Sequence, residues 1–351
     1  MVKVHILFEH SGDDNTPHGA SMLRLIQPLS HPDLSPYFKT TCGTAYQNTD
    51  ADIIIIDRLW KPDISFKDVE DLVRFTEKKD ITLIYSLDDN LLDLRKDEPG
   101  SPYPGTKEKN IIRYLIRESD GVIVSTEPLR ERIQSMNPQV IVVENQLDER
   151  LIPMNDRSRK KPKSPFITIG YMGTRTHDQD FFEILPAVKK LLWKYKDTIR
   201  LEFLGALGDD RYIHGLPNAT RLNNDGYVEY CKFWQWMNAN VFWDIALAPL
   251  RDDEFNRCKS DIKFLDYSAL HIPGVYSTTP SYENSVVHEK TGMLAHNETD
   301  EWVQNLEHLV ESRKLREEIG GQAHEYLLSG RVLKKNIFTW KNALEQIAQG
   351  A

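Results

Sequence analysis

The chain alternates short apolar runs with amphipathic stretches, and this alternation constrains its fold more than any other feature. Ala51–Asp57 (ADIIIID) is a near-continuous apolar run, as expected of a strand that is buried on both faces of a parallel sheet. The stretch VEDLVRFTEKK that follows has helical spacing, and a second apolar run comes after it at Ile81–Leu87. Strands that alternate with helices in this way predict an α/β protein with parallel, doubly wound sheets.

This pattern occurs twice, on either side of a basic segment that is broken by prolines. Between Asp148 and Pro165 the apolar pattern fades and the chain reads RSRKKPKSP, which is typical of a linker. The 351 residues also exceed the ~250 residues at which single cores stop growing. We therefore predict an N-terminal Rossmann-like domain over residues 1–155 and a second one over residues 156–330. Residues 331–351 are expected to form a C-terminal helix that could pack back on the first lobe.

Composition and charge limit the classes of function. A net charge of -9, from 44 basic and 53 acidic residues, disfavours a general nucleic-acid binder but leaves room for a local anion site. The three cysteines fit neither a disulfide framework nor a zinc spacing, which predicts a cytoplasmic protein. No apolar stretch approaches the ~20 residues of a membrane-spanning helix, although the basic linker could touch the inner face of a membrane.

Two loops that follow strands of the first lobe are candidate sites, because doubly wound sheets bind ligands at the carboxyl ends of their strands. The loop HSGDDNTPHGASML contains Gly19 and Ala20, where an open helix N-terminus could attract an anion. It has neither the GxGxxG nor the phosphate-loop spacing, which disfavours an NAD enzyme or an NTPase, and an ordinary turn is the alternative. Tyr85–Asn90 ends a buried strand with Asp88 and Asp89, which could bind a hydroxyl, hold a divalent metal or cap a helix.

A third candidate loop, GYMGTRTHDQD, opens the second lobe. It follows a strand and precedes a helix, so free backbone N–H groups and polar side chains can converge there on a phosphate. The residues with this potential are Gly173, Thr174, Arg175 and His177. A helix cap is the alternative explanation for the polar residues of this loop.

The fourth candidate is the most specific and lies before the helix that begins near residue 261. The polar loop ahead of this helix carries Arg257, Lys259 and Ser260. Lys259 and Lys263 are four residues apart and can share a helical face, with Asp266 further along. Two cations and a hydroxyl near a helix N-terminus can bind a diphosphate, and the carboxylate can accept hydrogen bonds from ribose hydroxyls. The alternative is a solvated helix start with an ion pair between Lys263 and Asp266.

This fourth segment and the chain after it resemble the donor domain of GT-B glycosyltransferases, and most nearly the retaining enzymes of family four. The sequence DYSALHIP at residues 266–273 falls where that family has Glu-Ala-Met-Ala-x-Gly-x-Pro. HEKTGML at residues 288–294 matches the family's xxGxTGxL strand turn, and the likeness covers most of residues 166–330. In the first lobe, Tyr85–Asn90 is similar to the aspartate-rich turn of bacterial polysaccharide transferases, and VIVVENQLDE resembles the strand and Asn-x-x-Asp turn that ends the acceptor lobe.

The resemblance implies two Rossmann-like lobes that face each other across a cleft. It also implies a metal-independent retaining glycosyltransferase, which moves a hexosyl or deoxyhexosyl group from a nucleotide-sugar to a glycan or lipid-linked acceptor in bacterial surface polysaccharide synthesis. No metal, cofactor or nucleic acid is expected to take part.

The same resemblance assigns roles to individual residues. Asp266 would bind the donor ribose, and Lys259 and Lys263 the diphosphate, with Lys263 also stabilising the leaving group. The remaining donor-binding candidates are Gly173, Thr174, Arg175, His177, Ser260, Tyr227 and Val228, the last two beside the nucleobase. The acceptor-side candidates are Gly19, Ala20, Asp88 and Asp89, with Asp88 also a catalytic candidate.

The chain departs from the family pattern at three positions. The first carboxylate of the family's Glu-x7-Glu motif, which holds a sugar hydroxyl, falls on Cys258, and the second is Asp266 instead of Glu. The Arg/Lys pair after the first donor-lobe strand is incomplete, with Asp180 near the expected lysine. Cys258 keeps open a second hypothesis, a nucleotide-sugar-binding subunit that lacks catalysis. An epimerase or phosphorylase of the same fold would need a different substrate pocket.

Overall fold

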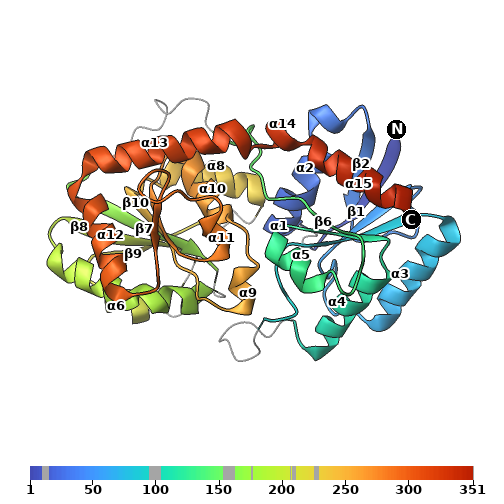
Figure 1. The fold of residues 1–351 in the computed structure, drawn as a ribbon, viewed down its shortest axis with the longest axis horizontal. Coiled ribbons are helices and arrows are strands. Elements are labelled where there is room, and N and C mark those ends of the chain that lie inside the picture. The colour runs from blue at the N-terminus through green and yellow to red at the C-terminus, as the bar shows by residue number, and fades with distance from the viewer. Residues whose placement is uncertain are drawn as a thin grey trace.

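The computed structural model describes residues 1–9, 16–94, 104–152, 163–174, 177–205, 207, 211–224 and 229–350. The chain forms two lobes, each built on a parallel sheet of six strands with helices on both faces (Figure 1). The α/β class with two doubly wound, Rossmann-like lobes, which the alternation of apolar and amphipathic segments predicted, is thus confirmed.

The first lobe contains a sheet with the strand order β2-β1-β3-β4-β5-β6. Its strands are β1 (Val2–Leu7), β2 (Phe38–Gly43), β3 (Ile53–Asp57), β4 (Thr82–Leu87), β5 (Gly121–Val124) and β6 (Val140–Val142). Every residue of β3 is buried, because its four isoleucines pack against the layers on both faces of the sheet. The larger helices are α3 (Phe66–Lys79), α4 (Thr106–Glu118) and α5 (Glu127–Ile133).

A short irregular helix follows β1 in this lobe. It consists of α1 (Gly19–Ser21), a π-helical turn at Met22–Ile26 and α2 (Gln27–Leu29), and a 3-10 turn at Pro32–Leu34 comes after it. Gly19 and Ala20, at the start of α1, border the site described below.

The second lobe repeats the architecture, with the strand order β12-β11-β10-β7-β8-β9. Its strands are β7 (Ile167–Gly173), β8 (Ile199–Gly205), β9 (Ala219–Leu222), β10 (Ile245–Ala248), β11 (Gly274–Ser277) and β12 (Met293–Ala295). Its helices are α6 (Asp178–Lys194), α7 (Arg211–His214), α8 (Tyr230–Asn240), α9 (Glu254–Arg257), α10 (Ile262–Ala269), α11 (Pro280–Glu283), α12 (Thr299–Glu311) and α13 (Arg313–Gly330).

After α13 the chain returns to the first lobe through α14 (Leu333–Asn336) and α15 (Phe338–Gly350), as Figure 1 shows. Trp340 and Ile347 of α15 join the hydrophobic cluster around Val4 and Ile6 of β1. At the crossing, the Leu147 N–H donates to the carbonyl of residue 331, so the two connections between the lobes run side by side. None of the helices in the described parts of the chain is long and apolar enough to span a membrane.

Candidate functional site

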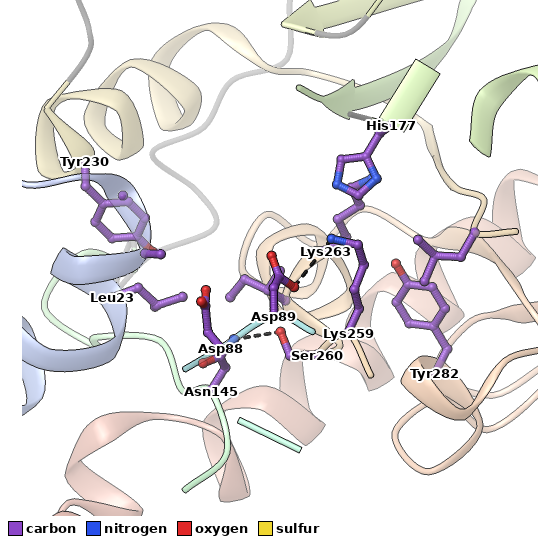
Figure 2. Close-up of a pocket in the computed structure, with 14 residues that line it drawn as sticks. Leu23, Asp88, Asp89, Asn145, His177, Tyr230, Lys259, Ser260, Lys263 and Tyr282 are labelled. Atoms are coloured by element: carbon purple, nitrogen blue, oxygen red, sulfur yellow. Dashed lines mark hydrogen bonds and ion pairs between the residues drawn. The ribbon is translucent and has the colours of Figure 1, made fainter. Parts of the chain in front are cut away.

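A pocket of about 240 Å³ lies between the two lobes, beyond the carboxyl ends of several strands (Figure 2). The first lobe contributes Gly19, Ala20, Leu23, Asp88, Asp89 and Asn145 to its lining. The second lobe contributes His177, Tyr230, Leu250, Lys259, Ser260, Ile262, Lys263 and Tyr282. Carboxylates therefore enter the pocket from one lobe and ammonium groups from the other.

The structure brings most of the residues predicted from the sequence to this pocket. Those that line it are Gly19, Ala20, Asp88, Asp89, His177, Lys259, Ser260 and Lys263. Gly173 and Thr174, at and just after the end of β7, are not among its lining residues, and neither is Asp266. Arg175, Tyr227 and Val228 lie outside the described residues. Arg257 forms an exposed ion pair with Asp252, so it adds no charge to the pocket.

Lys263 is a buried cation in the first turn of α10. Its side chain is only 8 % exposed, and Nζ lies 5.2 Å from the centre of the Tyr171 ring. No hydrogen-bond partner for Nζ is found among the described residues. Burial lowers the pKa of Lys263 to about 8, with a contribution from the charge of Lys259, although the charges of Asp180 and Asp266 oppose this shift. A buried ammonium without a hydrogen-bonded counter-ion is a site where an anionic ligand can supply the missing partner.

Lys259 and Ser260 extend this cationic surface toward the first lobe. Nζ of Lys259 lies 3.5 Å from Oδ1 of Asp89 and 4.3 Å from the centre of the Phe255 ring. The Ser260 hydroxyl accepts a hydrogen bond of 2.6 Å from Nδ2 of Asn145, which leaves its own hydrogen able to donate to a ligand. The loop thus offers a cation and a hydroxyl beside Lys263.

Asp266 lies on α10 next to the pocket. Burial raises the pKa of Asp266 to about 8, and its Oδ1 has no hydrogen-bond partner within the described part of the chain. Asp266 is also close to Tyr230, which lines the pocket. Burial raises the pKa of the Tyr230 phenol, and the charge of Asp266 raises it further. A carboxyl group in this state can bind a ligand hydroxyl.

His177 is held by Asp180, a buried residue in the first turn of α6. Nδ1 of the ring lies 2.8 Å from Oδ2 of Asp180, whose pKa is lowered by that hydrogen bond even though burial opposes it. Burial and the charges of Lys263 and Lys259 lower the pKa of His177 to about 4. The ring is therefore neutral at pH 7, and Nδ1–H donates to Asp180. Nε2 can donate to a phosphate only if ligand binding protonates the ring.

The carboxylates of the first lobe already have a cationic partner. Arg58 donates from Nε and Nη2 to Asp88, over 2.6 and 2.7 Å, and it also lies near Glu9 and Asp89. Although burial opposes ionisation, the Arg58 charge and hydrogen bonds lower the pKa of Asp88 to about 2. Within the described residues, no group of three or more His, Cys, Asp or Glu side chains is arranged to hold a metal ion.

Sequence reasoning missed three polar residues of the pocket, Asn145, Tyr230 and Tyr282. Asn145 follows β6. Its position could have been recognised from the sequence, because it begins the Asn-x-x-Asp turn at the end of the first lobe. Tyr230 begins α8, and its hydroxyl accepts a hydrogen bond of 2.9 Å from Nε1 of Trp234. The resemblance placed Tyr227 and Val228 beside the nucleobase, just ahead of this helix, but no motif marked Tyr230 itself.

Comparisons with known proteins agree on the fold. No protein-family model matches the chain, and no curated protein sequence matches it. Among solved structures, HepE of Anabaena in complex with UDP and glucose is 14% identical with a TM-score of 0.68, and the match covers 99% of this chain and 100% of HepE. TarM is 13% identical with a TM-score of 0.61, over 83% of this chain and 54% of TarM, so this chain spans about half of TarM's length.

A third structure, the sucrose-phosphate synthase of Thermosynechococcus elongatus, is 10% identical with a TM-score of 0.61, over 86% of this chain and 75% of the synthase. The two Rossmann-like lobes, with the pocket between them, are the GT-B fold that the sequence resemblance implied.

Proposed function

We propose that this GT-B protein is a metal-independent retaining glycosyltransferase. It would transfer a hexosyl or deoxyhexosyl group from a nucleotide-sugar to a glycan or lipid-linked acceptor, in bacterial surface polysaccharide synthesis. The observation that carries the proposal is the buried ammonium of Lys263, which faces the pocket between the lobes without a hydrogen-bond partner among the described residues. HepE, which has a similar fold, binds UDP and UDP-glucose in its crystal structures, and this supports the donor class.

The diphosphate of the donor would bind between Lys259 and Lys263 and accept a hydrogen bond from Ser260, all of which lie on one side of the pocket in Figure 2. The carboxyl group of Asp266 would bind a ribose hydroxyl, and the aromatic ring of Tyr230 would lie beside the nucleoside. The sugar would then point toward Gly19 and the first lobe. This orientation places the nucleotide on the cationic lobe and the acceptor near Asp88 and Asp89.

In the reaction, the bond between the anomeric carbon and the diphosphate oxygen breaks, and its electron pair goes to the diphosphate. Lys263 and Lys259 stabilise the negative charge that develops on that oxygen, and this lowers the barrier without a divalent ion. The acceptor hydroxyl oxygen forms the new bond to the same carbon and gives its proton to the departing phosphate. Asp88, which Arg58 holds in its ionised form, can accept a hydrogen bond from an acceptor hydroxyl but is a weak proton acceptor.

The second hypothesis is a nucleotide-sugar-binding subunit without catalysis, and Cys258 favours it. Where the related enzymes carry a carboxylate, this chain has a thiol that is only 4 % exposed and that does not line the pocket. Burial raises the pKa of Cys258 to about 11, so the thiol stays neutral. Without that carboxylate, a sugar hydroxyl must find another partner.

A panel of nucleotide-sugars distinguishes the two hypotheses. Purified protein is incubated with each donor, with and without EDTA, and the release of nucleoside diphosphate is measured in the presence of glycan or lipid-linked acceptors. A glycosyltransferase releases nucleoside diphosphate from at least one donor at the same rate with EDTA, and NMR of the product shows a retained anomeric configuration. Binding of a donor without release supports the binding subunit. The absence of binding by any donor contradicts both hypotheses.

A further inference from the structure

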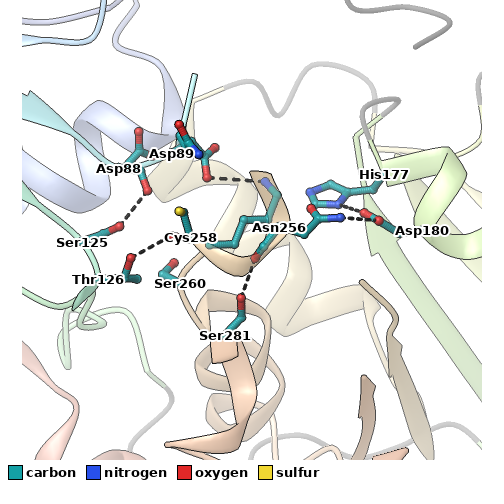
Figure 3. A network of polar contacts seen from close by, with 12 residues as sticks. Asp88, Asp89, Ser125, Thr126, His177, Asp180, Asn256, Cys258, Ser260 and Ser281 are labelled. Carbon is teal, nitrogen blue, oxygen red and sulfur yellow. Dashed lines mark hydrogen bonds and ion pairs between the residues drawn. The ribbon is translucent and has the colours of Figure 1, made fainter. Parts of the chain in front are cut away.

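The loop that carries Lys259 and Ser260 belongs to the second lobe, but much of its support comes from the first. Cys258, the residue before Lys259, is buried in a hydrophobic cluster whose other members all come from the first lobe, such as Leu87 and Leu129. Figure 3 shows the Cys258 thiol on the side of the loop that faces the first lobe. The residue that replaces the family's carboxylate thus serves as an apolar contact between the lobes.

Hydrogen bonds from the first lobe hold the same loop at its other polar groups. The Thr126 hydroxyl donates to the carbonyl oxygen of Cys258 over 2.8 Å, as the dashed line in Figure 3 marks. Nδ2 of Asn145 donates to the Ser260 hydroxyl over 2.6 Å. Residues of the first lobe therefore fix the backbone carbonyl of Cys258, which precedes Lys259, and the side chain of Ser260, which follows it.

Asn145 is itself held rigidly. Its Oδ1 accepts a hydrogen bond of 3.0 Å from the buried guanidinium of Arg24, and its carbonyl accepts one of 3.0 Å from Arg331. Arg24 lies over the ring of Trp340 in α15, and Arg331 forms a buried ion pair of 2.7 Å with Asp261, the residue after Ser260. The amide therefore has one orientation available, with Nδ2 toward Ser260.

We infer that Thr126 and Asn145 are positioning residues for the donor, acting through Lys259 and Ser260. This inference rests on the proposed function. The second lobe also holds the loop, for example through the hydrogen bond from the Lys259 N–H to the Asn256 carbonyl. The Cys258 carbonyl and the Ser260 hydroxyl, however, are bonded by the first lobe, so the diphosphate site is complete only when the first lobe is closed against it. Binding and closure are then thermodynamically linked. Closure of the lobes strengthens the binding of a nucleoside diphosphate to Lys259 and Ser260, and binding stabilises the closed arrangement by the same free energy.

Position 126 allows the contact between the lobes to be broken selectively. The Thr126 hydroxyl also accepts a hydrogen bond of 3.3 Å from the Leu129 N–H, which caps α5. In Thr126→Asp the carboxylate keeps the cap but cannot donate to the Cys258 carbonyl, whereas Thr126→Ser keeps both bonds. We expect Thr126→Asp to raise KM for the donor about tenfold, the loss of one good hydrogen bond, and Thr126→Ser to restore wild-type values.

The Cys258 thiol gives a readout that does not depend on activity. The purified full-length chain is treated with maleimide, and the modification rates of Cys258 and of the exposed Cys42 are followed by peptide mass spectrometry. We expect Cys258 to react at least several times faster in Thr126→Asp than in the wild type or Thr126→Ser, while Cys42 reacts at one rate in all three. UDP at saturating concentration should slow the reaction of Cys258 in the wild type.

Equal rates at Cys258 in a folded Thr126→Asp variant, together with an unchanged KM, overturn the inference. If Thr126→Asp does not fold, Asn145→Ala provides the same test, because it removes the hydrogen bond to Ser260 and leaves the α5 cap intact. A wild-type protein that binds no nucleoside diphosphate contradicts the proposed function and, with it, the role in donor positioning. In that case the thiol rates without ligand still show whether the two residues hold the loop.

Discussion

The two lobes bring charged clusters of different kinds to one pocket. In the first lobe, the Arg58 cation contacts Asp88, Glu9 and Asp89 over 2.6 to 3.4 Å, so it already has counter-ions within the protein. In the second lobe, Lys263 has no hydrogen-bond partner within the described residues, and its pKa is lowered by burial. A cation whose counter-ions belong to the protein supports the fold, whereas a buried cation without a hydrogen-bonded partner indicates where an anionic ligand can bind.

Removal of Arg58 should have the largest effect on stability. Arg58→Met leaves the Asp88 carboxylate, which is only 13 % exposed, without its partner, and we expect the free energy of unfolding to fall by about 3–5 kcal/mol. Urea unfolding measures it, with Arg313→Met as the control because the ion pair between Arg313 and Glu317 is exposed. A loss for Arg58→Met no larger than that of the control would show that the cluster in the first lobe is not structural.

Removal of Lys263 should affect activity instead of stability. Lys263→Met removes the ammonium that stabilises the leaving diphosphate, and we expect the transfer rate to fall about 10²–10³-fold. Because the variant also removes a buried charge without a hydrogen-bond partner, its free energy of unfolding should be no lower than that of the wild type. Lys290→Met, at an exposed position of the same lobe, is the matched control. If Lys263→Met is less stable than the wild type but transfers the sugar at the same rate, Lys263 supports the fold and not the reaction. That result would contradict the contrast between the lobes.

The affinity for a nucleoside diphosphate should depend on pH. With a pKa of about 8, Lys263 loses its charge above that pH, and Asp266 gains a negative charge in the same range. Both changes weaken anion binding as the pH rises, so we expect Kd to be about tenfold higher at pH 9 than at pH 7. In Lys263→Arg the cation does not titrate, and the slope should be shallower. Equal slopes in the two proteins would exclude Lys263 as the titrating cation.

His177 should have the smallest effect of the pocket residues tested. Its ring is neutral at pH 7, with a pKa of about 4, so His177→Asn removes a polar contact but no charge. We expect the affinity for a nucleoside diphosphate at pH 7.5 to fall by about threefold or less. A hundredfold loss would show instead that the bound state contains a protonated imidazole.

The sequence predicted those parts of the molecule that depend on local pattern. The run of four isoleucines in β3 predicted a strand buried on both faces, and the spacing of Lys259 and Lys263 predicted a cationic site at the start of a helix. Strand β2 was missed, because FKTTCG has no apolar run and lies at the edge of the sheet. Helix α8 and its Tyr230 were missed as well.

Features that depend on contacts between distant segments could not be predicted. Arg58 meets Asp88 because β3 and β4 pair in a register that aligns Asp57 with Ser86, and no local pattern specifies that register. In the same way, Cys258 was identified as a departure from a motif, but its packing against the first lobe follows from how the two lobes meet.

Calorimetric titration of nucleoside diphosphates into the wild type, Lys263→Met and Lys290→Met tests the central claim most directly. We predict that at least one nucleoside diphosphate binds the wild type and Lys290→Met with the same Kd, unchanged by EDTA. Lys263→Met should bind it at least tenfold more weakly, because a charged hydrogen bond is lost. If Lys263→Met binds as tightly as the wild type, the buried ammonium is not the diphosphate site, and the assignment of the pocket is wrong.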